Sequence, residues 1–155
     1  MPGGGGAGDA GGGPVSDAPA HDAPPLGLDL DGTIDENPAF FATLAAVWPA
    51  EVTVITFRRD RGKAAADLAR LGVKYDRLVL VDKMDAKAAV VAEHGIGVYV
   101  DDQDEMTANM PGGVTILNIR NGGNFDFAAR RWLYSDRTGE NLDARPGPGR
   151  TGGPR

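Results

Sequence analysis

Hydrophobic residues lie along the chain in short continuous runs, and these runs alternate with longer segments of helical periodicity. Runs rich in apolar and β-branched residues predict five strands, at 26–30, 51–57, 77–81, 96–100 and 114–119. Alanine-rich or periodic segments predict four helices, at 38–47, 60–71, 85–94 and 125–134. In the last helix, Phe125, Ala129 and Trp132 recur at helical spacing, so we expect them to face the core.

The alternation of strands and helices is typical of an α/β fold. Right-handed crossovers between successive strands produce a parallel sheet with helices on both faces. Continuous apolar runs agree with strands that are buried on both sides. We therefore expect a three-layer, Rossmann-like domain with a mostly parallel five-stranded sheet. Ligands bind at the carboxyl ends of the strands in such sheets, so functional side chains should directly follow strands.

Glycine and proline are concentrated at the two ends of the chain. Residues 1–25 contain 8 of the 23 glycines and 5 of the 11 prolines, and residues 144–155 contain 4 glycines and 3 prolines. These two segments offer little apolar surface to offset the loss of chain entropy, so we expect them to be disordered tails. Residues 26–143 then form one folded domain, which is long enough to bury a modest core.

Charge and composition exclude several classes of protein. The formal net charge of -6 argues against a general nucleic-acid binder, which needs a basic surface. The absence of cysteine excludes disulfides, thiolate metal sites and cysteine nucleophiles. No run is long and apolar enough to span a membrane, and the N-terminus lacks the pattern of a signal peptide. We therefore expect a cytoplasmic protein that does not bind membranes.

Polar residues that can carry chemistry follow the predicted strands. Acidic, hydroxyl or amino groups lie at three strand ends and on one helix, at Asp29, Asp31, Thr56, Lys87, Asp101 and Asp102. The fold would bring them to one edge of the sheet, where crowded carboxylates repel one another and resist ionisation. Mg²⁺ would relieve this repulsion, because it prefers oxygen ligands and retains a substrate phosphate in its shell. Lys87 would add positive charge between carboxylates and phosphate.

The order of these residues resembles the four motifs of the haloacid dehalogenase superfamily. The chain has an Asp-x-Asp-Gly-Thr run at 29–33, an apolar strand that ends in Thr56, then Lys87, and an apolar strand that ends in Asp101-Asp102. The resemblance covers residues 26 to about 119. It implies a HAD-like fold and a Mg²⁺-dependent phosphatase that hydrolyses phosphomonoesters, because members with the second aspartate of the first motif are mostly phosphatases.

The resemblance also implies a role for each residue. Asp29 would be the nucleophile that forms an aspartyl-phosphate. Asp31 would act as general acid and then as the base that activates water. Thr56 would bind the transferring phosphoryl group, and Lys87 would orient Asp29 and neutralise charge. Asp29, Asp31 through its backbone carbonyl, and the acidic pair at 101–102 would bind Mg²⁺.

Three assignments stay open at the level of sequence. Neighbouring residues in extended chain point in opposite directions, so only one of Asp101 and Asp102 should contact the metal, and family patterns favour Asp102. Lys83 is an alternative to Lys87, although the segment that starts at Lys87 leads directly into the acidic pair. Arg58 either lies on a charged surface or helps to bind substrate, since Thr-x-Arg at this point is similar to the 5′-nucleotidase branch of the superfamily.

The spacing of the motifs leaves no room for a cap domain. Asp31 to Thr56 spans 25 positions and Thr56 to Lys87 spans 31, and the predicted elements fill both intervals. An uncapped site admits a phosphorylated small molecule or a larger phosphoester, unless a second copy covers it in a homo-oligomer. The run at 121–124, Asn-Gly-Gly-Asn, is predicted to be a turn that lies near the rim of the site. The lack of a substrate-specific signature leaves a second function open, a phosphate-sensing or partner-binding module with negligible turnover.

Overall fold

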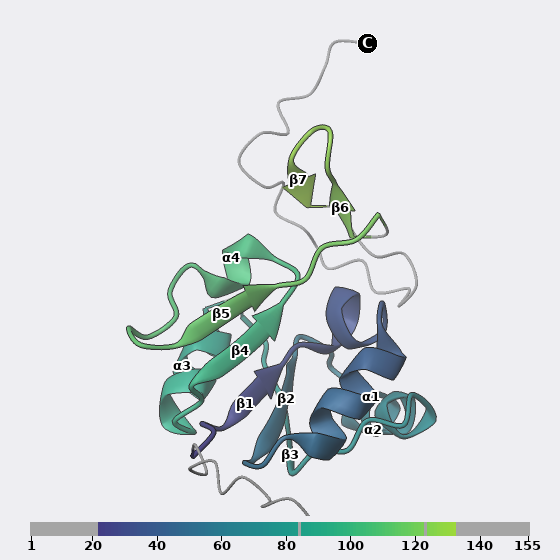
Figure 1. Cartoon of the computed structure of the whole chain (residues 1–155), viewed down its shortest axis with the longest axis vertical. Coiled ribbons are helices and arrows are strands. Elements are labelled where there is room, and N and C mark those ends of the chain that lie inside the picture. Colours follow the sequence, from purple (N-terminus) through teal and green to yellow (C-terminus); the bar gives the residue numbers. More distant parts are fainter. Residues whose placement is uncertain (1–21, 84, 123, 133–155) are drawn as a thin grey trace, which may run out of the picture.

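A computed structural model describes residues 22–83, 85–122 and 124–132 of the chain. Its centre is a five-stranded sheet whose strands lie side by side in the order β3-β2-β1-β4-β5 (Figure 1). The strands are β1 (Leu26–Leu28), β2 (Val52–Thr56), β3 (Arg77–Leu80), β4 (Val98–Asp101) and β5 (Thr115–Asn118). Every pair of neighbouring strands in this sheet is parallel, so the predicted α/β fold is confirmed.

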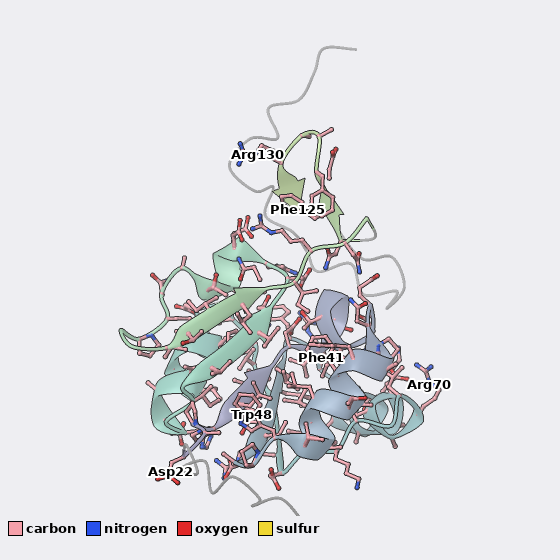
Figure 2. All side chains as sticks on the ribbon, in the orientation of Figure 1. Asp22, Phe41, Trp48, Arg70, Phe125 and Arg130 are labelled. Atoms are coloured by element: carbon pink, nitrogen blue, oxygen red, sulfur yellow. The ribbon has the colours of Figure 1, made fainter. Side chains whose placement is uncertain are left out.

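Helices lie on both faces of the sheet. They are α1 (Pro38–Val47), α2 (Arg61–Arg70), α3 (Ala86–Glu93) and the short α4 (Asp104–Thr107). α1 and α2 pack on one face, where Phe41 of α1 belongs to the same buried cluster as Leu28 and Val54 of the sheet (Figure 2). α3 packs on the other face, where Val91 shares a second buried cluster with Tyr99 of β4. The burial of apolar side chains on both faces produces the three-layer arrangement.

Local sequence signals explain where the helices begin and end. Pro38 is the first residue of α1, a position where its missing N–H is not needed. α2 begins after Asp60, whose side chain accepts a hydrogen bond from the Lys63 amide at 2.9 Å. It ends before Gly72, which has a φ of +72°. Because such signals are local, the predicted elements up to residue 119 are all present, with ends that differ by at most two residues.

Between β1 and α1 the chain forms a tight turn, η1 (Leu30–Ile34), which was not among the predicted elements. Asp31 and Gly32 leave helical geometry within this turn, and Gly32 has a φ of +83°. Glycine adopts this conformation readily because it has no Cβ. The first strand is therefore two residues shorter than predicted, and the chain turns directly at its carboxyl end.

The helix predicted at 125–134 is wrong. Phe125–Asp126 (β6) and Arg131–Trp132 (β7) pair instead as a small antiparallel sheet that projects beyond the main sheet (Figure 1). The Asp126 carboxylate accepts hydrogen bonds from the amides of Ala128 and Ala129 at 3.0 and 2.9 Å. An aspartate that bonds to the backbone just after it favours a turn over a helix interior, and here it reverses the chain.

The core-facing stripe predicted for this segment does not form. Ala129 is exposed, whereas Phe125 is buried near the base of the hairpin (Figure 2). The side chain of Trp132 and residues 133–134 lie outside what the structure describes. Residues three or four positions apart share a face in a helix but not in a hairpin, because side chains alternate between the two faces of a strand.

The described chain begins before the predicted domain boundary at residue 26. The carbonyl oxygen of Pro24 accepts a hydrogen bond from Trp48 Nε1 at 2.9 Å, and that of Pro25 accepts one from the Gly97 amide at 3.0 Å. These bonds attach residues 24 and 25 to the end of α1 and to the start of β4. Residues 1–21 of the tail predicted at 1–25, and the whole tail predicted at 144–155, lie outside the described residues. Within the described part of the chain, no helix has the length and apolar character needed to cross a membrane.

Candidate active site at the carboxyl edge of the sheet

The carboxyl ends of β2, β1 and β4 lie side by side at one edge of the sheet (Figure 1), and predicted site residues lie at each of these ends. β1 is the central strand. The chain adds β2 and β3 on one side of β1 and then β4 and β5 on the other side, so β1 marks the switch point of the sheet. Asp29 follows β1, Thr56 ends β2, and Asp101 ends β4. The Asp29 amide donates a hydrogen bond to the Val100 carbonyl at 2.9 Å, which holds the ends of β1 and β4 side by side.

Lys87 is the central cation of this site. It lies in the first turn of α3, is 1% exposed, and its Nζ lies 2.6 Å from Asp29 Oδ1 and 2.7 Å from Asp101 Oδ2. Burial by itself would lower the pKa of Lys87, but the charges of Asp101 and Asp29 outweigh it and raise that pKa well above its ordinary value. The ammonium group therefore stays charged at neutral pH. The alternative lysine, Lys83, is exposed, so Lys87 is the one that contacts the carboxylates.

Both carboxylate oxygens of Asp101 accept hydrogen bonds from the protein. Oδ2 accepts from Lys87 Nζ and from the Tyr99 hydroxyl, each at 2.7 Å, and Oδ1 accepts from the Gln103 amide at 2.9 Å. Burial raises the pKa of Tyr99 well above its ordinary value, so its hydroxyl remains a proton donor. These contacts fix Asp101 in one orientation and hold it against Lys87.

Asp29, Asp101 and Asp102 form a buried cluster of carboxylates. One oxygen from each lies within 4.8 Å of the others, and the three residues are at most 4% exposed. Burial raises the pKa of Asp29 well above its ordinary value; Lys87 acts in the opposite direction, and the charges of Asp101 and Asp102 add to the increase. A divalent cation among these oxygens would remove the repulsion, and an all-oxygen donor set suits a hard cation such as Mg²⁺.

The η1 turn lets Asp102 approach Asp29. A Cβ on Gly32 would lie 2.4 Å from Asp102 Oδ2, so only glycine leaves space for this carboxylate. Thr33 is fully buried, and its hydroxyl lies 3.4 Å from Asp29 Oδ2 and 3.5 Å from Asp102 Oδ1. The geometry thus explains the Gly-Thr pair of this motif. Gly32 leaves space for the carboxylate of Asp102, and the hydroxyl of Thr33 contacts the carboxylates of both Asp29 and Asp102.

Asp31 lies beside the cluster and is held by the buried side chain of Arg58. Nε of Arg58 lies 2.9 and 3.0 Å from the two oxygens of Asp31, and Nη2 lies 2.6 Å from Oδ1. Nη1 of Arg58 contacts Asp67 of α2 at 2.6 Å. Burial would lower the pKa of Arg58, but bonding to Asp31 and Asp67 raises it above its ordinary value. Thr56 Oγ1 completes the group at 3.4 Å from Asp31 Oδ2.

The structure places all seven residues that the sequence analysis selected at this edge of the sheet: Asp29, Asp31, Thr56, Arg58, Lys87, Asp101 and Asp102. Tyr99, Asp67 and Asn124 also contribute to the site, and the sequence did not predict their contributions. No local pattern distinguishes Tyr99 from an ordinary strand residue or Asp67 from an ordinary helix residue. The Asn-Gly-Gly-Asn run was the signal that pointed toward Asn124, whose Nδ2 donates to the Gly32 carbonyl.

Comparisons of the chain with protein-family models, with curated proteins and with solved structures give no match. The function therefore has to be inferred from the chemistry of the site. The site combines a buried carboxylate cluster, a buried lysine between two of those carboxylates, and a threonine at a strand end. Such a combination can hold a divalent cation next to an anionic group and stabilise negative charge on it.

Proposed function

We propose that the protein is a Mg²⁺-dependent hydrolase of phosphomonoesters that acts through an aspartyl-phosphate on Asp29. The observation that carries this proposal is the buried cluster in which Asp29, Asp101 and Asp102 meet Lys87 at the switch point of the sheet. The order of the same residues along the chain supports membership of the haloacid dehalogenase superfamily.

Charge balance supports a divalent cation at this site. Five carboxylates (Asp29, Asp31, Asp67, Asp101 and Asp102) face three cations (Arg58, Arg70 and Lys87), so in their charged forms they leave two negative charges that one Mg²⁺ would neutralise. We assign Asp29 and Asp102 as the side chains that bind the metal, and we assign Asp101, whose two oxygens accept three hydrogen bonds from Lys87, Tyr99 and the Gln103 amide, as the carboxylate that holds Lys87 in place. The backbone carbonyl of Asp31 is the third assigned protein ligand. Bound Mg²⁺ would supply positive charge that stabilises the transferring phosphoryl group.

Asp29 is the residue that we assign as nucleophile. Lys87 holds its Oδ1 at 2.6 Å, and the Thr33 hydroxyl lies 3.4 Å from its Oδ2. Burial disfavours the ionised form that attack requires, and the charge of Lys87 favours it. Attack of an Asp29 oxygen on phosphorus would form an O–P bond, break the ester P–O bond and release the alcohol of the substrate. Attack of water on phosphorus would then break the aspartyl O–P bond, release inorganic phosphate and restore Asp29.

Asp31 is assigned as the general acid and base. It would protonate the leaving oxygen of the substrate in the first step and take a proton from the attacking water in the second. Thr56 and Arg58 orient its carboxylate. Both oxygens of Asp31 contact Arg58 in this structure, so a substrate phosphate that drew Arg58 away would free Asp31 for proton transfer. In this interpretation, Arg58 binds Asp31 in the free protein and the substrate phosphate in the complex, which gives it the predicted role in substrate binding.

The substrate class follows from the chemistry of the site, and we propose a phosphorylated small molecule or a larger phosphoester. The Thr-x-Arg sequence at 56–58 keeps a 5′-nucleotidase as the first activity to assay. An uncapped site stays a prediction, as do a homo-oligomer and a cytoplasmic location. The intervals in which a cap domain would be inserted hold only short elements in the described chain: η1 and α1 lie between β1 and β2, and α2 lies between β2 and β3.

Hydrolysis of p-nitrophenyl phosphate and of nucleoside monophosphates tests the proposal. We expect turnover with Mg²⁺ and none with a chelator. Asp29→Asn should lower kcat by roughly 10³-fold or more, because it removes the nucleophile. Asp76→Asn is the matched control, since the Asp76 carboxylate accepts a hydrogen bond from the Val52 amide at the opposite edge of the sheet. The control should retain the wild-type kcat.

Two results would contradict the proposal. Turnover that does not depend on metal would exclude the assigned role of Mg²⁺, and full activity in Asp29→Asn would exclude the aspartyl-phosphate. Binding of Mg²⁺ and BeF₃⁻ without hydrolysis across a broad panel of phosphoesters would instead favour the alternative function, a phosphate-sensing or partner-binding module.

A further inference from the structure

The loop that follows β5 reaches back to the η1 turn through one buried side chain. Asn124 is fully buried, although it lies in a polar stretch between β5 and β6. Its Nδ2 donates hydrogen bonds to the carbonyl oxygen of Gly32 at 2.9 Å and to that of Ile119 at 3.1 Å. One side-chain amide therefore joins the chain after β1 to the chain after β5, across 92 positions of sequence.

The orientation of Asn124 is itself held by Asn121. The Asn121 amide donates to Asn124 Oδ1 at 2.8 Å, and the Asn124 amide donates to Asn121 Oδ1 at 3.1 Å. Asn121 Nδ2 lies 3.3 Å from Glu36 Oε2, just beyond η1. Because Oδ1 of Asn124 accepts a backbone amide, its Nδ2 is the end that faces the two carbonyls. The network thus determines which way the Asn124 side chain points.

The backbone of Gly32 is held at both its amide and its carbonyl group by side chains. It has a φ of +83° and no Cβ, so its peptide units are less restrained than those of its neighbours. Its amide donates to Asp35 Oδ1 at 2.6 Å, and the bond from Asn124 holds its carbonyl. Asp31 and Thr33 flank it, and the side chains of both contact the candidate site. A rotation of the Gly32 peptide would displace these two residues.

We propose that Asn124 is a positioning residue for the catalytic turn. By holding the Gly32 carbonyl, it keeps Asp31 and Thr33, whose hydroxyl contacts Asp29, in the geometry that phosphoryl transfer requires. This inference rests on the proposed function, and it adds the loop after β5 to a site that the motifs place on β1, β2, α3 and β4. Asn124 acts through the turn and not on the substrate. A displacement of about 1 Å in a reacting group lowers rates by roughly 10²-fold, so even a small rearrangement should be measurable.

Asn124→Ala and Asn124→Ser, compared with Asn118→Ala, test this role in the full-length protein. Asn118 is an exposed asparagine of β5 whose side chain donates to Asp104 rather than to the turn. We expect the Asn124 variants to lower kcat for p-nitrophenyl phosphate by roughly 10- to 100-fold per folded molecule, with little change in KM. Asn118→Ala should retain the wild-type kcat. Circular dichroism gives the folded fraction, and the serine variant is used if the alanine variant does not fold.

Amide hydrogen exchange is a second measurement that does not depend on catalysis. The Gly32 amide donates to Asp35 Oδ1, and the Asp35 amide donates to the Leu30 carbonyl at 3.2 Å, so both amides report on the turn. They should exchange faster in the Asn124 variants and at the wild-type rate in Asn118→Ala.

Faster exchange at these amides, together with a lower kcat per folded molecule, supports the proposal. A wild-type kcat in a folded Asn124 variant overturns it, and so does unchanged exchange at Gly32 and Asp35. If the wild-type protein hydrolyses no phosphoester under any condition, the proposed function fails separately. The exchange measurement then decides by itself whether Asn124 holds the turn.

Discussion

At the scale of single residues, Asp35 shows how burial beside the site changes the chemistry of a carboxyl group. Its Oδ1 accepts the Gly32 amide, while its Oδ2 is buried and has no hydrogen-bond partner among the described residues. Burial raises the pKa of Asp35 to about 6, although the bond from Gly32 acts in the opposite direction. Protonation relieves the cost of an ionised carboxylate with an unpaired buried oxygen.

Asp35 should therefore make the fold less stable as the pH rises. Its folded pKa of about 6 lies above the ordinary value of 3.8, so the folded state binds the proton more tightly. The stability from this group is present below 3.8 and is lost as the pH rises through about 6. Asp35→Asn cannot ionise, so we expect it to gain stability relative to wild type over this range. Urea denaturation of both proteins in chelator, at several pH values, measures the difference. A difference that does not vary with pH would contradict the prediction.

At the scale of elements, the η1 turn and the end of α2 each depend on a glycine with positive φ. Gly32 has a φ of +83°, and Gly72 has a φ of +72°. Their surroundings differ, because a Cβ on Gly32 would lie 2.4 Å from Asp102 Oδ2 while a Cβ on Gly72 would have no atom within 4 Å. The two glycines therefore separate the cost of backbone strain from the loss of site geometry.

Gly32→Ala and Gly72→Ala should each lose about 1 kcal/mol of stability from backbone strain. Only Gly32→Ala should also lose affinity for Mg²⁺, by at least about tenfold, because Asp102 would have to move away from the site. Calorimetric titration with Mg²⁺ measures the affinity. Thermal unfolding measures the backbone strain in Gly72→Ala, and in Gly32→Ala it measures the strain together with the cost of moving Asp102. Equal Mg²⁺ affinity in the two variants would argue that Asp102 does not bind the metal.

At the scale of the whole molecule, the crowded carboxylates should link metal binding to the stability of the fold. The cluster of Asp29, Asp101 and Asp102 exists in the folded chain and not in the unfolded one, so Mg²⁺ should raise the Tm. The expected gain is about 2.7 kcal/mol when free Mg²⁺ is about 100 times the Kd. Differential scanning calorimetry with Mg²⁺ and with chelator measures this gain. No change in Tm at saturating Mg²⁺ would contradict a metal site.

Metal binding should also release protons. Because burial raises the pKa of Asp29 well above its ordinary value and the metal binds the ionised form, the apparent Mg²⁺ affinity should increase with pH. Titration calorimetry in two buffers with different ionisation enthalpies counts the released protons. Asp29→Asn should show neither the proton release nor the gain in Tm.

The sequence by itself determined the order of the strands and helices and the positions of the reactive residues at the strand ends. Apolar runs, caps and glycines act over a few residues, so their effects could be inferred from the chain up to residue 119. Parallel strands place their carboxyl ends at one edge, and this rule was enough to group Asp29, Thr56 and Asp101. The location of the candidate site and the types of residue in it therefore follow largely from the local sequence pattern and from the parallel topology of the sheet.

Only the tertiary structure decided which of these side chains contact one another. It placed Lys87 rather than Lys83 between two carboxylates, engaged both oxygens of Asp101, and brought Asn124 to Gly32. It also replaced the predicted C-terminal helix by a hairpin, where side-chain bonds to the turn outweighed helical spacing. The physical reason is that burial and hydrogen bonding between residues far apart in sequence depend on how the elements pack, and periodicity along the chain carries no record of that packing.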